Sequence, residues 1–235
     1  VDATTLDAIR ESAGRVDVQL SLLVAGDDPP DLRDGEYELG ELLDQASPEF
    51  GDNPARADSL GFWNFSGGTT GKPKGVPHHH AHGVFGARSF QEAAHFTPDD
   101  VVLRIPKLFF HYARDLGMNW PLRAGAAVCL FPERTTPELV FRLIAKYRPT
   151  ILVNVPTMMR AMLESAKAAT ADLSFMRLCV SSGEALSGRL YRDFRQTFGV
   201  EVINAHGSAE TNCAFFVDRA GDVRPGASGR LAPLT

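Results

Sequence analysis

Short apolar runs alternate with helical segments along most of this chain, and this alternation limits the possible fold more than any other feature. Strands are predicted over residues 16–24, 60–65, 101–105, 126–131, 150–155, 176–181 and 200–204. Helices are predicted over residues 137–147, 156–168 and 187–198, the last one capped by Ser187 and closed by Gly199. The repeated strand–helix–strand order predicts an α/β fold with a mostly parallel sheet covered by helices.

Composition excludes several classes of function. The 235 residues are enough for a real hydrophobic core, and the net charge of −5 gives no reason to expect nucleic acid or an anionic membrane as a partner. No apolar run approaches the roughly 20 residues that cross a bilayer, and no signal peptide opens the sequence. Three widely spaced cysteines predict neither a disulfide framework nor a zinc site. We therefore expect a cytoplasmic protein without a nucleic-acid or membrane partner.

Residues 66–75 read Ser-Gly-Gly-Thr-Thr-Gly-Lys-Pro-Lys-Gly and directly follow the apolar run 60–65. Glycines let backbone N–H groups approach a ligand closely, and hydroxyls and lysines add donors and positive charge, so the segment is suited to nucleotide phosphates. It is not a Walker-type loop, because Pro73 follows Gly71-Lys72. No helix is expected to begin at Lys72, since a proline biases the preceding residue toward extended backbone. Composition alone leaves a flexible surface loop as the alternative.

The order of these residues resembles the signature loop of the adenylate-forming superfamily, which includes acyl- and aryl-CoA ligases, luciferases and adenylation domains. Residues 76–82 (VPHHHAH) and 107–110 (KLFF) look most like the benzoate-CoA ligase branch. Residues 181–186 (SSGEAL) and 207–210 (GSAE) continue the resemblance in the same order, so that it covers about residues 60–231.

The resemblance implies that the chain is a central piece of a large N-terminal domain. Residues 1–59 are expected to be part of a preceding subdomain and a linker, and residues 60–235 to form the ATP- and acyl-binding subdomain. A Thr-Gly-Asp motif for the ribose and a small C-terminal catalytic domain are expected to be missing. The isolated chain is therefore not expected to complete adenylation at a useful rate.

The implied activity is ATP-dependent conversion of a carboxylic acid, expected to be aromatic, into an acyl-adenylate and then a CoA thioester. The implied cofactors of this acid–thiol ligase are ATP, Mg²⁺ and CoA. Two alternatives stay open: an adenylation unit that loads a carrier protein, and a non-catalytic nucleotide-binding fragment. Ala209 favours the last one, because the family usually has a Thr there whose hydroxyl contacts the α-phosphate.

The resemblance also assigns residues to four roles. Phosphates are expected to be held by Ser66, Thr69, Thr70 and Lys74, with backbone geometry supplied by Gly67, Gly68, Gly71 and Gly75. Glu210 is expected to hold Mg²⁺ and, with Lys74, to be catalytic. The adenine pocket is assigned to Gly183, Glu184, Ala185, Asn204, Ala205, His206, Gly207 and Ser208. The acyl pocket is assigned to Phe110, His111, Tyr112, Ala205 and Cys213.

Physical chemistry supports the assignment of Glu210 independently. Glu210 follows a strand end, where ligands of α/β sheets usually bind, and Mg²⁺ prefers carboxylate oxygens. From their places in the two matched motifs, the resemblance implies that Lys74 and Glu210 face one phosphate-sized space flanked by Phe65 and Phe110. His111 occupies a position where the benzoate branch has a small residue, which suggests a smaller acid or one with a polar group. An exposed His111 outside the pocket is the alternative.

Other conspicuous residues are expected to be structural. His78, His79, His80 and His82 cannot all ligate one ion, because consecutive side chains point in different directions, so the cluster is expected to open a helix. Lys107 and the Arg114-Asp115 pair are expected to be solvated surface charges. Gly183 and Gly207 could also be simple turn glycines.

Overall fold

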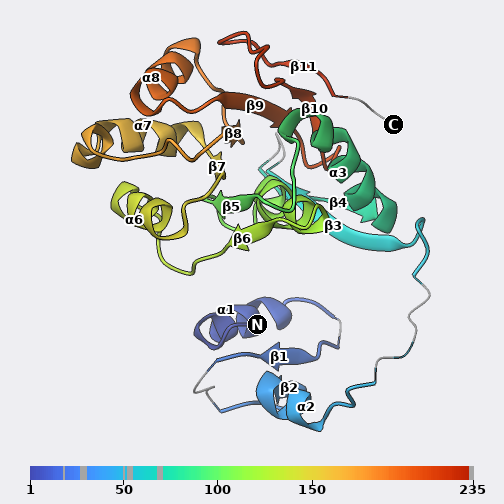
Figure 1. The fold of residues 1–235 in the computed structure, drawn as a ribbon. Coiled ribbons are helices and arrows are strands. Elements are labelled where there is room, and N and C mark those ends of the chain that lie inside the picture. Colours follow the sequence, from blue (N-terminus) through green and yellow to red (C-terminus); the bar gives the residue numbers. More distant parts are fainter. Residues whose placement is uncertain (18, 27–30, 50, 52–54, 68–70, 233–235) are drawn as a thin grey trace. The chain divides into compact units, whose positions relative to one another are not determined.

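The computed structural model describes residues 1–17, 19–26, 31–49, 51, 55–67 and 71–232. The chain divides into two compact units, Val1–Pro54 and Ala55–Thr235 (Figure 1). The boundary predicted from the sequence lies five residues later, after residue 59.

The first unit is small. It contains the short helix η1 (Ala3–Thr5), α1 (Leu6–Ala13), β1 (Leu22–Val24), β2 (Glu36–Glu38) and α2 (Leu39–Gln45). The two strands form a parallel pair in which Leu22 lies opposite Glu36. The strand predicted over residues 16–24 is therefore too long, because its partner strand offers only three residues for pairing.

The second unit carries the main sheet and begins with a hairpin. Strands β3 (Leu60–Ser66) and β4 (Lys74–His79) pair antiparallel and lead into α3 (His80–Ala94). The expectation that the histidine cluster opens a helix is confirmed, since α3 begins at His80. The residue Lys72 precedes a strand rather than a helix, as Pro73 predicts.

Alternating strands and helices follow the hairpin. They are β5 (Val101–Arg104), α4 (His111–Arg114), the π-helical turn η2 (Asp115–Asn119), α5 (Trp120–Arg123), β6 (Ala127–Cys129), α6 (Pro137–Tyr147), β7 (Ile151–Asn154), α7 (Pro156–Glu164), η3 (Ala166–Ala169), β8 (Leu178–Ser182), α8 (Gly188–Phe198), β9 (Val202–Gly207), β10 (Ala214–Val217) and β11 (Arg230–Leu231). The seven-stranded sheet has the order β11-β10-β9-β8-β7-β5-β6. Strands β5 to β9 are parallel, and β10 and β11 are antiparallel. The predicted α/β class with a mostly parallel sheet is confirmed.

Local sequence signals explain the helix ends. The Ser187 side chain accepts a hydrogen bond from the Leu190 N–H at the start of α8, and Gly199 ends it with a left-handed φ of 71°. The helix predicted over residues 156–168 is divided, because Ser165 is extended and its side chain caps η3 instead.

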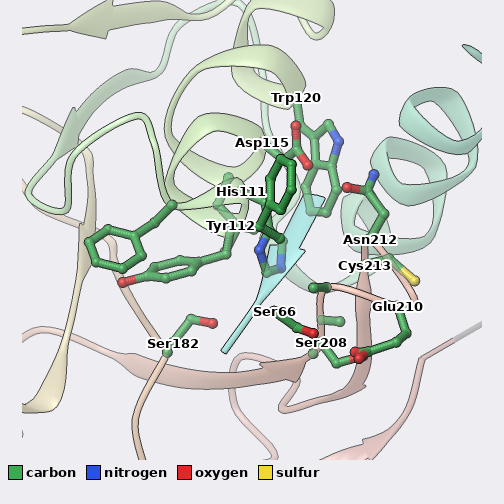
Figure 2. A pocket seen from close by; sticks show the side chains of 17 residues that line it. Ser66, His111, Tyr112, Asp115, Trp120, Ser182, Ser208, Glu210, Asn212 and Cys213 are labelled. Carbon is green, nitrogen blue, oxygen red and sulfur yellow. The ribbon is translucent and has the colours of Figure 1, made fainter. Parts of the chain in front are cut away.

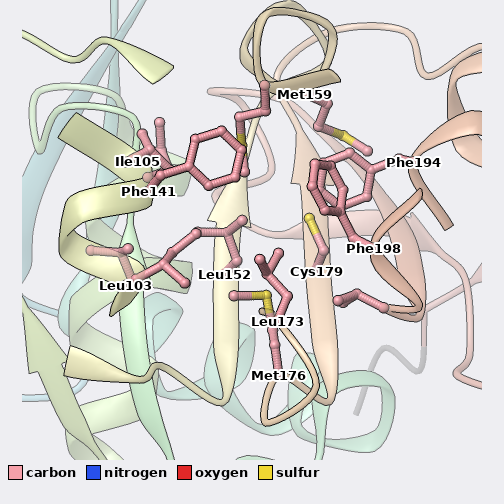
Figure 3. Close-up of a cluster of buried hydrophobic side chains, with 14 of the residues drawn as sticks. Leu103, Ile105, Phe141, Leu152, Met159, Leu173, Met176, Cys179, Phe194 and Phe198 are labelled. Carbon is pink, nitrogen blue, oxygen red and sulfur yellow. The ribbon is translucent and has the colours of Figure 1, made fainter. Parts of the chain in front are cut away.

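Helices cover both faces of the sheet. Figure 1 shows α6, α7 and α8 together on one face, and α3 lies on the other. Leu152 and Cys179 point toward the first group and pack with Phe141 and Phe194, as Figure 3 shows. Full burial of one such large apolar side chain contributes about 1.5–3 kcal/mol. The carboxyl ends of β5, β7, β8 and β9 therefore meet at one edge of a rigid platform.

Candidate functional site

A cavity of about 390 Å³ lies at this carboxyl edge (Figure 2). One wall is formed by the segment α4–η2–α5, and a second by the end of β8 together with the loop after β9. Phe65 and Ser66, at the end of β3, and Phe110 complete the lining. Elements far apart in the sequence thus converge on one concave site, as is usual for ligand pockets in α/β folds.

Two glycines shape the cavity wall. Gly183 has a φ of 84°, and an added Cβ there would lie 2.9 Å from the Tyr112 ring. At Gly207 an added Cβ would lie 2.4 Å from the carbonyl oxygen of Cys213. The loop 208–213 can fold back on the end of β9 only because Gly207 has no side chain.

The carboxylate of Glu210 lies beside two hydroxyl groups. Its own backbone N–H, followed by the Ser208 and Ser66 hydroxyls, lowers the pKa of Glu210. The side chain is exposed to solvent and stays ionised at neutral pH. A carboxylate with neighbouring hydroxyls is a suitable oxygen donor set for Mg²⁺ bound together with substrate phosphates.

The hairpin anchors the Glu210 loop from below. The His78 Nε2–H donates to the Ala209 carbonyl oxygen at 2.7 Å, and Asn64 Nδ2 donates to Asn212 Oδ1 at 2.7 Å. Since Nε2 carries the proton, His78 Nδ1 accepts from His82 Nδ1–H at 3.0 Å. The His78 side chain is only 1% exposed, so its hydrogen bond to the Ala209 carbonyl is shielded from water, whereas its partner His82 is exposed.

The structure brings many of the expected site residues together. The cavity is lined by Ser66, Phe110, His111, Tyr112, Gly183, Gly207, Ser208, Glu210 and Cys213. Lys74 is exposed and does not line the cavity, but it lies directly opposite Ser66 in the hairpin. Gly68, Thr69 and Thr70 lie outside the described residues. Gly67 and Gly71 are described but are not part of the cavity wall.

The expected adenine residues lie in different surroundings. The Glu184 carboxylate accepts hydrogen bonds from the Thr157 N–H at 3.0 Å and from its hydroxyl at 2.5 Å, which caps α7. Asn204 is buried, whereas Ala185 and His206 are exposed. Ala205 does not line the cavity, because the alternation of side chains along β9 directs it into the core beside Ile203 and Val217.

Of the groups expected to be solvated surface charges, Asp115 is buried, whereas Lys107 is partly exposed and bonded to backbone carbonyls. Lys107 Nζ donates to the carbonyl oxygens of Pro132 at 3.1 Å and Glu133 at 2.6 Å, and it lies 4.9 Å from the centre of the Phe131 ring. Asp115 is only 3% exposed and lines the cavity. It lies four residues after His111, so the helical turn brings both side chains to the same wall.

His111 lines the cavity and is half-buried, so the alternative of an exposed residue outside the pocket is wrong. Burial lowers the pKa of His111, and the nearby Asp115 carboxylate opposes this effect. The imidazole is therefore neutral at neutral pH, with one nitrogen as a donor and the other as an acceptor.

Comparison with known proteins identifies the family. The family pattern described as "AMP-binding enzyme" matches residues 1–235, the whole chain. The chain belongs to the AMP-binding enzyme family. The predicted relationship to adenylate-forming acyl- and aryl-CoA ligases is thereby confirmed.

Individual relatives agree with this assignment. A benzoate–CoA ligase of Thauera aromatica is 36% identical over 221 residues, which are 94% of this chain and 41% of that protein. A 4-hydroxybenzoate–CoA/benzoate–CoA ligase of Rhodopseudomonas palustris is 36% identical over 228 residues, 95% of this chain and 41% of the relative. This AMP-binding chain thus spans about two fifths of the length of these curated relatives.

Solved structures share the fold. The anthranilate CoA ligase AuaEII in complex with anthranoyl-AMP superimposes with a TM-score of 0.89 at 28% identity, over 99% of this chain and 44% of that one. A benzoate CoA ligase from Burkholderia xenovorans LB400 gives a TM-score of 0.85 at 30% identity, over 99% of this chain and 45% of the other.

Several candidate residues of this AMP-binding chain were missed by sequence reasoning. Asn64, Asn212 and Trp120 carried no motif signal of their own, although Asn64 is a polar residue inside an apolar strand. His78 lies in the histidine cluster, which was expected only to open a helix. Among the helices of the described residues, none is both long and apolar enough to cross a membrane.

Proposed function

We propose that the complete protein activates a carboxylic acid, expected to be aromatic, with ATP and then transfers the acyl group to CoA. The observation that carries this proposal is the single cavity in which Glu210 and Ser66 meet aromatic side chains. A polar end suits phosphates and a carboxylate, and an end lined by Phe110, Leu116 and Trp120 suits an aromatic ring.

Adenylation would join two anions. A carboxylate oxygen of the acid attacks the α-phosphorus of ATP, the new C(O)O–P bond forms, and the bond to the β-phosphate oxygen breaks to release pyrophosphate. The Ser66 hydroxyl, Lys74 and backbone N–H groups of the Gly-rich segment would hold the β- and γ-phosphates. Lys74 is suited to this role because it pairs with Ser66 and its side chain is exposed.

Glu210 would hold Mg²⁺. The fit rests on its lowered pKa, its exposure and the adjacent Ser66 and Ser208 hydroxyls. Mg²⁺, when bound, supplies positive charge where negative charge builds up between the acid and the triphosphate. The adenine role of Gly183, Glu184, Asn204, Ala205 and their neighbours stays a prediction.

Thioester formation would follow on the same adenylate. The thiol sulfur attacks the acyl carbon, AMP leaves with the bonding electron pair, and the thiol proton is released. We place the enzyme in the cytoplasm, where ATP and CoA are available and where the free thiols Cys129, Cys179 and Cys213 would persist.

The deciding assay is exchange of labelled pyrophosphate into ATP by the complete gene product, with benzoate and substituted benzoates. We expect exchange that depends on the acid and on Mg²⁺, followed by a thioester when CoA is added. Glu210→Gln should lower the exchange rate by about 10²–10³-fold, the range seen for loss of one transition-state contact. Glu164→Gln, an exposed change on α7, is the matched control and should leave the rate unchanged.

Two results would count against the proposal. Absence of exchange with every aromatic acid would exclude acid activation of this class. Acyl transfer to a carrier protein but not to CoA would show that the thiol acceptor is a carrier protein rather than CoA.

A further inference from the structure

One end of the cavity carries polar groups that the chemistry of adenylation does not use. Figure 2 shows His111 between the Ser66–Glu210 end and the region of Asp115 and Trp120. His111 begins α4 and Asp115 begins η2, so the two side chains lie one helical turn apart. The His111–Asp115 region therefore belongs to the aromatic end of the cavity, beside Trp120, and is distinct from the Ser66–Glu210 end.

Asp115 retains capacity to accept hydrogen bonds. Its side chain is only 4% exposed. Asn119 Nδ2 donates to Oδ1 at 2.9 Å, whereas the two Arg114 contacts, at 3.3 and 3.4 Å, are long. A carboxylate offers about four acceptor positions, so these three contacts leave at least one of them unused at a residue that lines the cavity.

Donors without partners lie at the same end. In the part of the chain that the structure describes, His111 makes no hydrogen bond through either ring nitrogen. The same holds for two buried donors of cavity-lining residues, Trp120 Nε1 and Asn212 Nδ2. Buried donors of this kind normally have partners, and a bound ligand group is one way to supply them.

We infer that this end of the cavity selects aromatic acids that carry a ring hydroxyl, which donates to the Asp115 carboxylate and accepts from the His111 imidazole. The inference rests on the proposed function and names the substrate class of the same site. A phenol hydroxyl is both donor and acceptor, and therefore satisfies both side chains. An aromatic amine donates to Asp115 but is a poor acceptor for His111.

Other acids fit less well. Unsubstituted benzoate would displace water from Asp115 and His111 and offer no hydrogen bonds in return. A site with polar side chains left unpaired in this way discriminates strongly against the ligand that lacks the hydroxyl. An acid with a second carboxylate would meet the negative charge of Asp115. The expected order of preference is therefore hydroxybenzoate, then aminobenzoate, then benzoate.

The test measures kcat/KM of the complete gene product for benzoate and for the three isomers each of hydroxy- and aminobenzoate. Pyrophosphate release reports adenylation. We expect at least one hydroxybenzoate to exceed benzoate by about tenfold or more. Asp115→Asn and His111→Ala should each reduce that ratio several-fold. Asp193→Asn, an exposed change on α8, is the matched control and should keep the ratio.

Each outcome has a definite meaning. If benzoates are activated but neither variant changes the ratio, or if benzoate or an aminobenzoate is the preferred acid, the inference is wrong and the proposed function stands. If no benzoate is activated at all, the proposed function itself fails. Should Asp115→Asn fold poorly because Arg114 and Asn119 lose their partner, His111→Ala still decides, since His111 makes no hydrogen bond within the described residues.

Discussion

The hydrogen bond from His78 to the Ala209 carbonyl connects the hairpin to the loop that carries Glu210, and His78→Phe tests what it contributes. Phenylalanine keeps the ring, which stacks on Phe62 with 5.2 Å between ring centres. It removes the donor to Ala209 at 2.7 Å and the acceptor for His82 at 3.0 Å. The change therefore isolates two hydrogen bonds with little loss of volume.

The magnitude follows from the burial of His78. The Ala209 carbonyl is buried, whereas His82 is exposed and can hydrogen-bond to water instead. A buried polar group that loses its partner costs about 1–3 kcal/mol, so His78→Phe should lower the free energy of unfolding by about that amount. For a unit of this size, 1 kcal/mol corresponds to about 2–4 °C, which gives a fall in melting temperature of about 2–12 °C. Asn64 limits the loss only slightly, because its contact with the Ala209 carbonyl is 3.5 Å long.

The variant should also disturb Mg²⁺ use. Ala209 precedes Glu210, so a released carbonyl lets the carboxylate leave its position beside Ser66. We expect the Mg²⁺ concentration for half-maximal pyrophosphate exchange to rise about tenfold, equivalent to about 1.4 kcal/mol. His78→Gln, whose amide can donate to the same carbonyl, should recover part of the loss.

An exposed histidine nearby provides the control for His78→Phe. His80→Phe makes the same substitution at an exposed residue two positions along and should change neither quantity. An unchanged melting temperature for His78→Phe would refute the energetic reasoning. A lower melting temperature with unchanged Mg²⁺ dependence would show that His78 stabilises the fold without positioning Glu210.

Three further predictions follow. Burial lowers the pKa of His82 and His111 below the ordinary 6.5, so these side chains bind protons more tightly in the unfolded chain than in the folded chain. The contribution of the two neutral imidazoles to stability is therefore fully present above about pH 6.5, and it is lost as the pH falls through their pKa values in the folded chain. The decrease in melting temperature on acidification should be smaller in the double variant His82→Asn/His111→Asn. An equal decrease in the two proteins would contradict this. Iodoacetamide followed by mass spectrometry should label Cys213 before the fully buried Cys179, and an acyl-adenylate analogue should protect Cys213; unchanged labelling would place it outside the site. Ala209→Thr, which restores a hydroxyl usual in the resembled family, should raise the exchange rate about tenfold, whereas the isosteric Ala209→Val should not; equal effects would refute a role for the hydroxyl.

Local sequence signals determined the fold class and the helix ends of this protein. Ser187 and Gly199 mark the ends of α8, and Thr136 caps α6 through the Leu139 N–H. Pro73 excludes a helix at Lys72. These signals depend on residues within a few positions of one another, so they act in any tertiary context that permits the element. The family resemblance rests on the same kind of contiguous motif.

Only the tertiary structure decided how the site is supported. His78 and Ala209 are 131 positions apart, and Asn64 and Asn212 are 148 apart, so no local pattern connects them. In the sequence, Asp115 beside Arg114 is typical of a surface charge, but in the structure the helical turn after β5 places it in the cavity wall. Such contacts depend on which strand ends meet at the sheet edge, and that is set by the packing of both faces rather than by any short segment.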